Sequence, residues 1–297
     1  PPLRLFLYPS GHTALNLKNG SSPSSIYSAG MEIKYGLSNS FTLDATLIPD
    51  FGQVTFDDEE LNLSPFEQRF DENRAFFTEG ANIFKKAVVG HFRGGDFFYS
   101  RRIGQEVNFD EDEFLESNEE LVDYDNKPKL INAIKFSGTT NSKLSIGLLN
   151  AITGESNATI RNIEDGSVRK ENLAPVTNYN VISLTQQLLN DYSSVGIHNT
   201  NVNRSEGGLN ANNTVFVTDL FDEKRNFNFT SRFYFSKAPR LSEKNGFRGS
   251  ISLEELRGNI QFAAGWVGTD KFYNQNELGY FNQLNNQRVY TRIKYQI

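Results

Sequence analysis

The chain has 297 residues, a net charge of −6 and a hydrophobic content of only 37%, yet aromatic residues reach 13% with 25 Phe and 12 Tyr. It holds no apolar run of 18 residues, which excludes a transmembrane helix but not membrane β-strands, in which only alternate residues are apolar. The absence of cysteine excludes disulfides, thiolate nucleophiles and zinc–thiolate sites. The first residues show no signal-peptide pattern.

Residues 1–30 read as an N-terminal strand, Leu3 to Tyr8, followed by a linker rich in Gly, Ser, Asn and Pro. Residues 31–48 then predict a hairpin of two strands. Apolar and polar residues alternate from Met31 to Leu37, a Ser-Asn-Ser turn follows, and alternation resumes at Phe41.

Residues 49–95 break this alternation and form an acidic segment rich in Phe. Ser64, Pro65 and Glu67 have the form of a capping box with Pro at the first helical position, which predicts a short helix there. The aromatic residues of this segment need a surface to pack against, and we expect them to anchor it. These predicted anchors are Phe51, Phe66, Phe70, Phe76, Phe77 and Phe84.

Residues 96–297 predict further strands in antiparallel pairs, among them Val176 to Leu189 with Ser193 to Thr200. The stretch 105–126 holds ten acidic residues and no basic one, and a run of like charge predicts a solvated, mobile loop. It lacks the glycine and the regular spacing of a calcium loop.

Strand length and loop length favour a membrane barrel over a soluble sandwich. Several predicted strands reach the ~9 to 11 residues that a tilted strand needs to cross a bilayer, whereas soluble strands average ~5 to 6. Short turns also alternate with long connections, as in outer-membrane barrels. The predicted fold is therefore an all-β, antiparallel transmembrane outer-membrane β-barrel with an inward-folded, plug-like segment that contains the short helix.

Three stretches carry a resemblance to a known family: IPDFGQV, LNLSPFEQRFDENRAFFTEGANIF and FFYSRRIG. They resemble the signature of a membrane-associated barrel family of unknown function found chiefly in Bacteroidota. The resemblance covers residues 31–104 closely and continues loosely to the end, with departures at Ile48, Gly52, Ala75 and Thr78. The acidic stretch 105–126 is not a feature of that family.

In such proteins a carbohydrate-binding family-nine-like domain usually precedes the barrel, and the barrel is longer than this chain. The resemblance thus implies that the chain is a fragment whose barrel is incomplete. The alternative is that the stretch from Val289 to Ile297 is the closing strand.

A polar cluster can be assembled from charged residues in and near the predicted plug, and it has two interpretations. It could hold paired carboxylates for glycoside chemistry, or its arginines could pair with carboxylates to dock the plug inside the barrel, which we favour. The cluster comprises Asp50, Glu67, Glu72, Arg74, Glu79, Arg101 and Arg102, with Arg69 beside it.

No catalytic, phosphate-binding or dinucleotide motif occurs, and His12, His91 and His198 lie far apart. The sequence leaves an enzymatic activity open but favours a protein that is not an enzyme, and we predict no metal and no cofactor. We also predict no nucleic-acid partner, because basic residues are scattered singly. The predicted function is a solute channel or transporter, or a structural subunit of an envelope complex, in the outer membrane of a Gram-negative bacterium. Its expected partners are outer-membrane lipid, other outer-membrane or periplasmic proteins, and a glycan ligand.

Two alternatives stay open from the sequence. One is a glycan-binding or glycan-processing protein of the cell surface, and the other is a soluble β-sandwich interaction domain.

Overall fold

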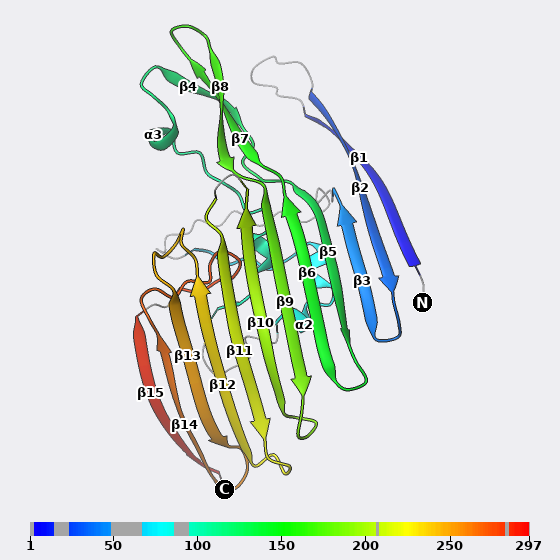
Figure 1. The fold of residues 1–297 in the computed structure, drawn as a ribbon, viewed down its shortest axis with the longest axis vertical. Coiled ribbons are helices and arrows are strands. Elements are labelled where there is room, and N and C mark those ends of the chain that lie inside the picture. The colour runs from blue at the N-terminus through cyan, green and yellow to red at the C-terminus, as the bar shows by residue number, and fades with distance from the viewer. Residues whose placement is uncertain are drawn as a thin grey trace.

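The fold is dominated by one antiparallel sheet of twelve strands (Figure 1). The computed structural model describes residues 3–14, 24–48, 67–85, 95–205, 208–282 and 285–296. Along the sheet the order is β1-β2-β3-β5-β6-β9-β10-β11-β12-β13-β14-β15. The bounds are β1 Leu3–Ala14, β2 Ser24–Gly36, β3 Phe41–Leu47, β5 Leu130–Thr139, β6 Leu144–Thr153, β9 Thr177–Gln187, β10 Ser194–Arg204, β11 Ala211–Phe221, β12 Phe227–Lys237, β13 Gly246–Glu255, β14 Ile260–Thr269 and β15 Asn286–Tyr295.

The all-β, antiparallel prediction is confirmed, but the sheet is open. Among the described residues, β1 and β15 form its two edges and do not pair with each other. The predicted hairpins at the Ser-Asn-Ser turn and around Asn190 are both present, as β2–β3 and β9–β10. Strand β2 begins at Ser24, inside the stretch interpreted as a linker.

Connections alternate in length between the two ends of the sheet. The links β2–β3, β5–β6, β9–β10, β11–β12 and β13–β14 span four to six residues each and lie at one end. The chain between β3 and β5, between β6 and β9, and between β14 and β15 is much longer and returns at the other end. The link β10–β11, at this second end, is only six residues long, so the predicted alternation of short and long loops holds in part.

The two faces of the sheet have opposite chemistry. The inner face, defined here as the face against residues 67–85, buries polar side chains such as Lys135, Ser183 and Thr200. The outer face exposes apolar side chains. Among these are Ile134, Leu148, Ile182, Ile197, Phe216, Phe235, Ile251, Leu253 and Phe262.

A second, smaller sheet extends beyond the end where the long connections lie (Figure 1). It joins β4 (Glu119–Tyr124), β7 (Ser156–Asn162) and β8 (Val168–Ala174) in the order β4-β7-β8, with α3 (Glu111–Phe114) just before β4 in the chain. The stretch 105–126, predicted as a solvated and mobile loop, therefore contains a helical turn and a strand.

Arginines from the neighbouring strands explain why this acidic stretch is ordered. Arg169 donates to both oxygens of Glu119 at 2.7 and 2.9 Å, and Arg161 pairs with Glu120. Because these bases come from β7 and β8, the acidic stretch gains its counter-charges only when the three strands meet.

The short helices lie elsewhere than predicted. Residues 67–70 are not helical, and Ser64 to Phe66 lie outside the described residues. The helical turns of this region are α1 (Ala75–Thr78) and α2 (Asn82–Lys85), followed by the 3₁₀ helix η2 (Ser100–Arg102). None of the helices in the described part of the chain has the length and apolar character needed to span a bilayer.

We expect the second sheet to loosen in acid. The hydrogen bond from Arg169 lowers the pKa of Glu119 to about 2, so this pair contributes stability above pH ~4.5 that is lost as the pH falls toward 2. Amide hydrogen exchange in β4, β7 and β8 should therefore quicken over that range. Glu119→Gln should remove most of this pH dependence, and an identical pH profile in the variant would contradict the assignment.

Candidate functional site

The candidate site is a layer of chain packed on the inner face of the sheet. We call residues 67–85 and 95–104 the insert. The connection 270–282, between β14 and β15, joins it through the bridge between Asp96 and Tyr280 and through the bond from Tyr99 N to Leu278 O, 2.8 Å long. Gly95 has φ +76°, and a Cβ there would lie 1.8 Å from Tyr280 O, so this junction requires glycine.

Glu72 and Arg74 form the central ion pair of the insert. Arg74 Nε and Nη2 donate to the two carboxylate oxygens of Glu72 at 2.8 and 2.7 Å, and Ser100 Oγ donates to the same carboxylate at 2.6 Å. Arg74 also donates to the carbonyls of Ser100 and Ile103. Burial alone would raise the pKa of Glu72, but the hydrogen bond and charge of Arg74, with Ser100, hold that pKa below its ordinary value.

A second bidentate pair joins the two parts of the insert. Arg102 Nη1 and Nη2 donate to the carboxylate of Glu67 at 2.8 and 2.6 Å. Arg102 Nε reaches Gly279 O at 3.1 Å, so one side chain links both parts of the insert to the 270–282 connection. Arg101 was expected to pair with a carboxylate, and it donates two hydrogen bonds to the backbone oxygen of Asp71.

Lys135 of β5 fastens the insert to the sheet. Its Nζ donates to Phe76 O at 2.6 Å and to Glu79 O at 2.7 Å, which lie in and just after α1. Asp44 of β3, directly across in the strand register, lies 3.4 Å from the same nitrogen. Lys135 is 1% exposed, so a buried cation receives its counter-charge from the sheet and its acceptors from the insert.

Three of the predicted aromatic anchors are buried in one cluster. Phe76, Phe77 and Phe84 pack with residues of the large sheet that include Ala133 of β5 and Leu149 of β6. Phe70 is half-buried, and Tyr99 OH both donates to and accepts from its backbone. Asp50, Phe51 and Phe66 lie outside the described residues.

Of the predicted polar cluster, the structure brings together Glu67 with Arg102 and Glu72 with Arg74. Glu79 pairs instead with Lys34 of β2, and Arg69 with Asp96 at 2.6 Å. We did not predict from the sequence that Lys135, Tyr99 and the 270–282 connection belong to this site. The sequence did contain a signal for Lys135. It occupies the polar face of a predicted strand, as Asp44 occupies the polar face of another.

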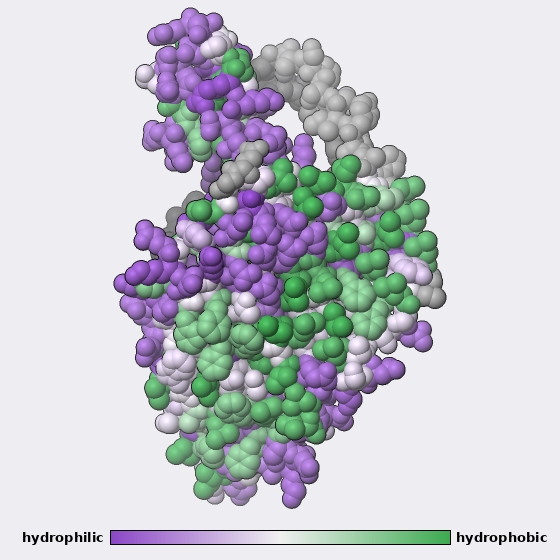
Figure 2. Space-filling view, viewed as in Figure 1, coloured by the Kyte–Doolittle hydropathy of each residue, from purple (hydrophilic) through white to green (hydrophobic). Residues whose placement is uncertain are grey.

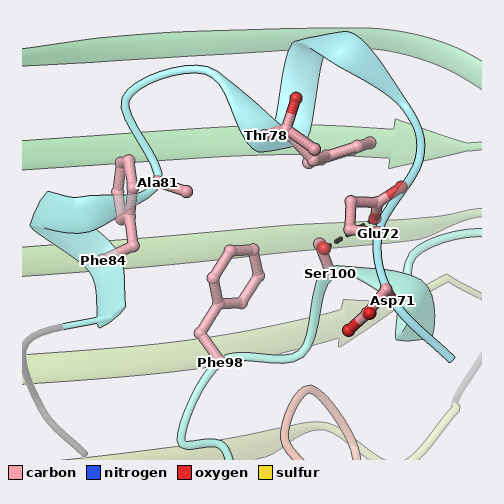
Figure 3. A pocket seen from close by; sticks show the side chains of 8 residues that line it. Asp71, Glu72, Thr78, Ala81, Phe84, Phe98 and Ser100 are labelled. Carbon is pink, nitrogen blue, oxygen red and sulfur yellow. Dashed lines mark hydrogen bonds between the residues drawn. The ribbon is translucent and has the colours of Figure 1, made fainter. Parts of the chain in front are cut away.

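A small pocket of about 180 Å³ opens beside the Glu72 pair (Figure 3). Carboxylate and hydroxyl groups line one part of it and phenylalanine rings the other. Its walls are Asp71, Glu72, Phe77, Thr78, Ala81, Phe84, Phe98 and Ser100. Glu72, the most buried carboxylate in its wall, is already bound by Arg74 and Ser100, so the pocket holds no free acid–base pair.

No three acidic or histidine side chains gather as a metal site would require anywhere in the described ranges. Ser183 and His198 do meet, 2.8 Å apart at Nδ1. Since Ser183 Oγ donates to Ile83 O at 2.7 Å, its proton fastens α2 to the sheet and is not directed at the imidazole.

These features define a class: an open antiparallel β-sheet with an apolar outer face and a polar inner face that is filled by an ordered insert. The chain belongs to the family DUF5916, a domain of unknown function, which it matches over residues 1–297. The predicted membership of a family of unknown function is confirmed. Its restriction to Bacteroidota and the preceding carbohydrate-binding domain stay predictions.

Solved structures similar to this chain include outer-membrane proteins. In-vitro folded OmpT, an outer membrane protein of Vibrio cholerae, is 9% identical with a TM-score of 0.37, over 98% of this chain and 94% of that one. Its trimer form is 10% identical with a TM-score of 0.35, over 99% and 100%. The likeness is low. No curated protein matches the chain.

Lys135→Met is expected to release α1 from the sheet. The change leaves Asp44 and two insert carbonyls without their cation, and breaking a buried pair costs about 3 to 5 kcal/mol. Amides of residues 76–85 should exchange faster while those of β9 and β10 keep their protection. Lys143→Met, at a solvent-exposed pair with Asp191, is the matched control and should cost under ~1 kcal/mol.

Equal protection of the insert in Lys135→Met and the wild type would contradict this role of Lys135.

Proposed function

We propose that the chain forms the wall of an outer-membrane β-barrel and that the insert fills its lumen as a plug. One observation carries the proposal: the sheet exposes its apolar face and buries its polar face. A soluble sandwich would need the reverse, because its exposed face meets water. A continuous apolar outer face is stable when lipid covers it.

The strand register adds a second line of support. One row of paired outer-face residues is apolar on β1, β2, β3 and β5 and becomes polar on β6, β9, β10 and β11. The row reads Leu5, Ile33, Ala45, Ile134, Asn150, Asn180, Asn201 and Asn212.

The edge of the apolar area moves along the strands from row to row. In the adjacent row, closer to the short turns, the apolar side chains continue through Leu148 and Ile182 and give way at Asn199 of β10. In the row after that, Leu184, Ile197 and Phe216 are all apolar. The apolar area thus recedes toward the short turns over β6, β9, β10 and β11, and it reaches the Asn199 row again at Phe235 and Phe247.

Loop lengths orient the proposed barrel. Outer-membrane barrels have short periplasmic turns and long outer loops. We therefore infer that the end bearing the β4-β7-β8 sheet faces outward and the end with the tight turns faces the periplasm.

The contacts of the insert support a lumen that the insert blocks at rest. Lys135 is buried, the side chains of Glu72 and Arg74 are only 11% exposed, and each of the three makes several charge-assisted hydrogen bonds. We infer a structural role for the chain, as a subunit of the envelope whose lumen is blocked by the insert. Passage of a solute would require these hydrogen bonds to break. A glycan-processing role is less well supported, because Glu67 and Glu72 are both neutralised by bidentate arginines.

Phe216→Arg is expected to impair membrane insertion. An arginine on the lipid face near the middle of the bilayer costs about 2 to 4 kcal/mol. Reconstitution into phospholipid vesicles, followed by heat-modifiable gel mobility and protease protection, would measure the inserted fraction. Asn203→Arg, on the same outer face but beyond the apolar area, is the control and should insert normally.

If both variants insert as well as the wild type, or if the wild-type chain is a monomer in water without detergent, the membrane proposal fails.

A closed plug predicts low conductance. In planar bilayers the inserted wild-type chain should stay closed, whereas Lys135→Met combined with Arg74→Met should show transient openings because both fastenings of the insert are lost. A steady open-pore current from the wild type would contradict the plug.

A further inference from the structure

Seven asparagines form a patch on the outer face of the sheet. We call these residues the asparagine patch: Asn150, Asn178, Asn180, Asn199, Asn201, Asn203 and Asn212, on β6, β9, β10 and β11. Figure 2 shows hydrophilic side chains gathered over the upper parts of the central strands, with hydrophobic side chains below them. The patch lies on the side of the apolar edge nearer the long connections.

Hydrogen bonds tie the asparagines into two groups across the strands. Asn150 Nδ2 donates to Asn178 Oδ1 at 2.7 Å and to Asn180 Oδ1 at 2.8 Å. Asn199 Nδ2 donates to Asn212 Oδ1 at 3.1 Å and to Thr214 Oγ1 at 2.8 Å. The patch is therefore preorganised, with its amide planes held by their neighbours.

Donors and acceptors are left over on the same surface. Within the described residues, Asn178 Nδ2, Asn150 Oδ1 and Asn203 Oδ1 make no hydrogen bond to protein. The surface thus offers both donors and acceptors to a ligand.

The patch carries no charged side chain of its own, and Lys237 of β12 is paired with Asn212 only at its margin. Neutral amides are suited to hydroxyl groups, which both donate and accept, and are less suited to phosphates, for which arginine and lysine are the usual partners. Phe235 and Phe247 lie in the same row as Asn199 on the far side of the patch, where aromatic residues of a membrane barrel mark the interface.

We propose that the asparagine patch binds the sugar headgroup of a glycolipid in the leaflet next to the long connections. This inference rests on the proposed function, because it needs the apolar area to be covered by lipid. The acyl chains would then lie on Ile182, Ile197 and Phe216, and the hydroxyls of the attached sugar would meet the amides directly above them.

The test uses the chain in nanodiscs of phosphatidylcholine with a few per cent of a diglucosyl diacylglycerol of the same acyl chains. Native mass spectrometry counts the lipids that remain bound. The wild type should retain the diglucosyl lipid about tenfold over phosphatidylcholine, equivalent to about 1.4 kcal/mol. Raising the salt concentration should leave the ratio unchanged, because the contacts are uncharged.

The variant Asn178→Ala with Asn203→Ala removes spare groups while keeping most of the cross-strand bonds, and it should lose this preference. The matched control is Asn157→Ala with Asn172→Ala, which removes a cross-strand amide pair of the second sheet, and it should keep the preference.

Equal retention by the patch variant and the wild type would overturn the inference. So would a wild-type preference for phosphatidylglycerol that declines with salt, which would indicate phosphate recognition. Insertion into nanodiscs without sugar preference overturns this inference alone, whereas failure to insert overturns the proposed function as well.

Discussion

The buried cation Lys135 is the constraint on which the arrangement depends. A charged amine inside a protein needs counter-charge and acceptors, and it obtains the first from Asp44 of the sheet and the second from the backbone around α1. Ser183, also on the inner face, likewise donates to a backbone oxygen of the insert, Ile83 O. Because that face is polar, the insert is held mainly by directed hydrogen bonds, and the Phe76, Phe77 and Phe84 cluster fills the space between them.

The strands of the large sheet could be predicted from sequence because alternation is local. The alternation of apolar and polar residues from Met31 to Leu37 predicts a strand by itself, whichever strand pairs with it. The second sheet was missed for the opposite reason: Glu119 and Glu120 read as a solvated charge run until Arg161 and Arg169, some 40 to 50 residues away, neutralise them. The capping box at Ser64 predicted a helix, but residues 67–70 form neither helix nor strand. There Tyr99 binds Phe70 and Arg102 binds Glu67. Tertiary contacts there overrode a local preference.

Glu67 pairs with Arg102 and Glu72 with Arg74, and the docking interpretation of the polar cluster would use such pairs. The sequence could not say which carboxylate each arginine would choose. It also could not say which face of a strand is covered. Once the register is known, the row from Leu5 to Asn212 shows where the outer face changes from apolar to polar side chains, since only the register aligns residues that are far apart in the chain.

The bond from Arg102 to Gly279 spans 177 residues of sequence. The insert leaves the chain after β3, yet part of its binding surface comes from the connection that follows β14. Contacts of such separation form late, because the loop they close carries a large entropic cost. Twelve strands therefore have to be largely in place before the insert acquires all its partners, and a partly folded chain would present the polar inner face uncovered. The slowest step in folding this molecule should accordingly be the docking of the insert.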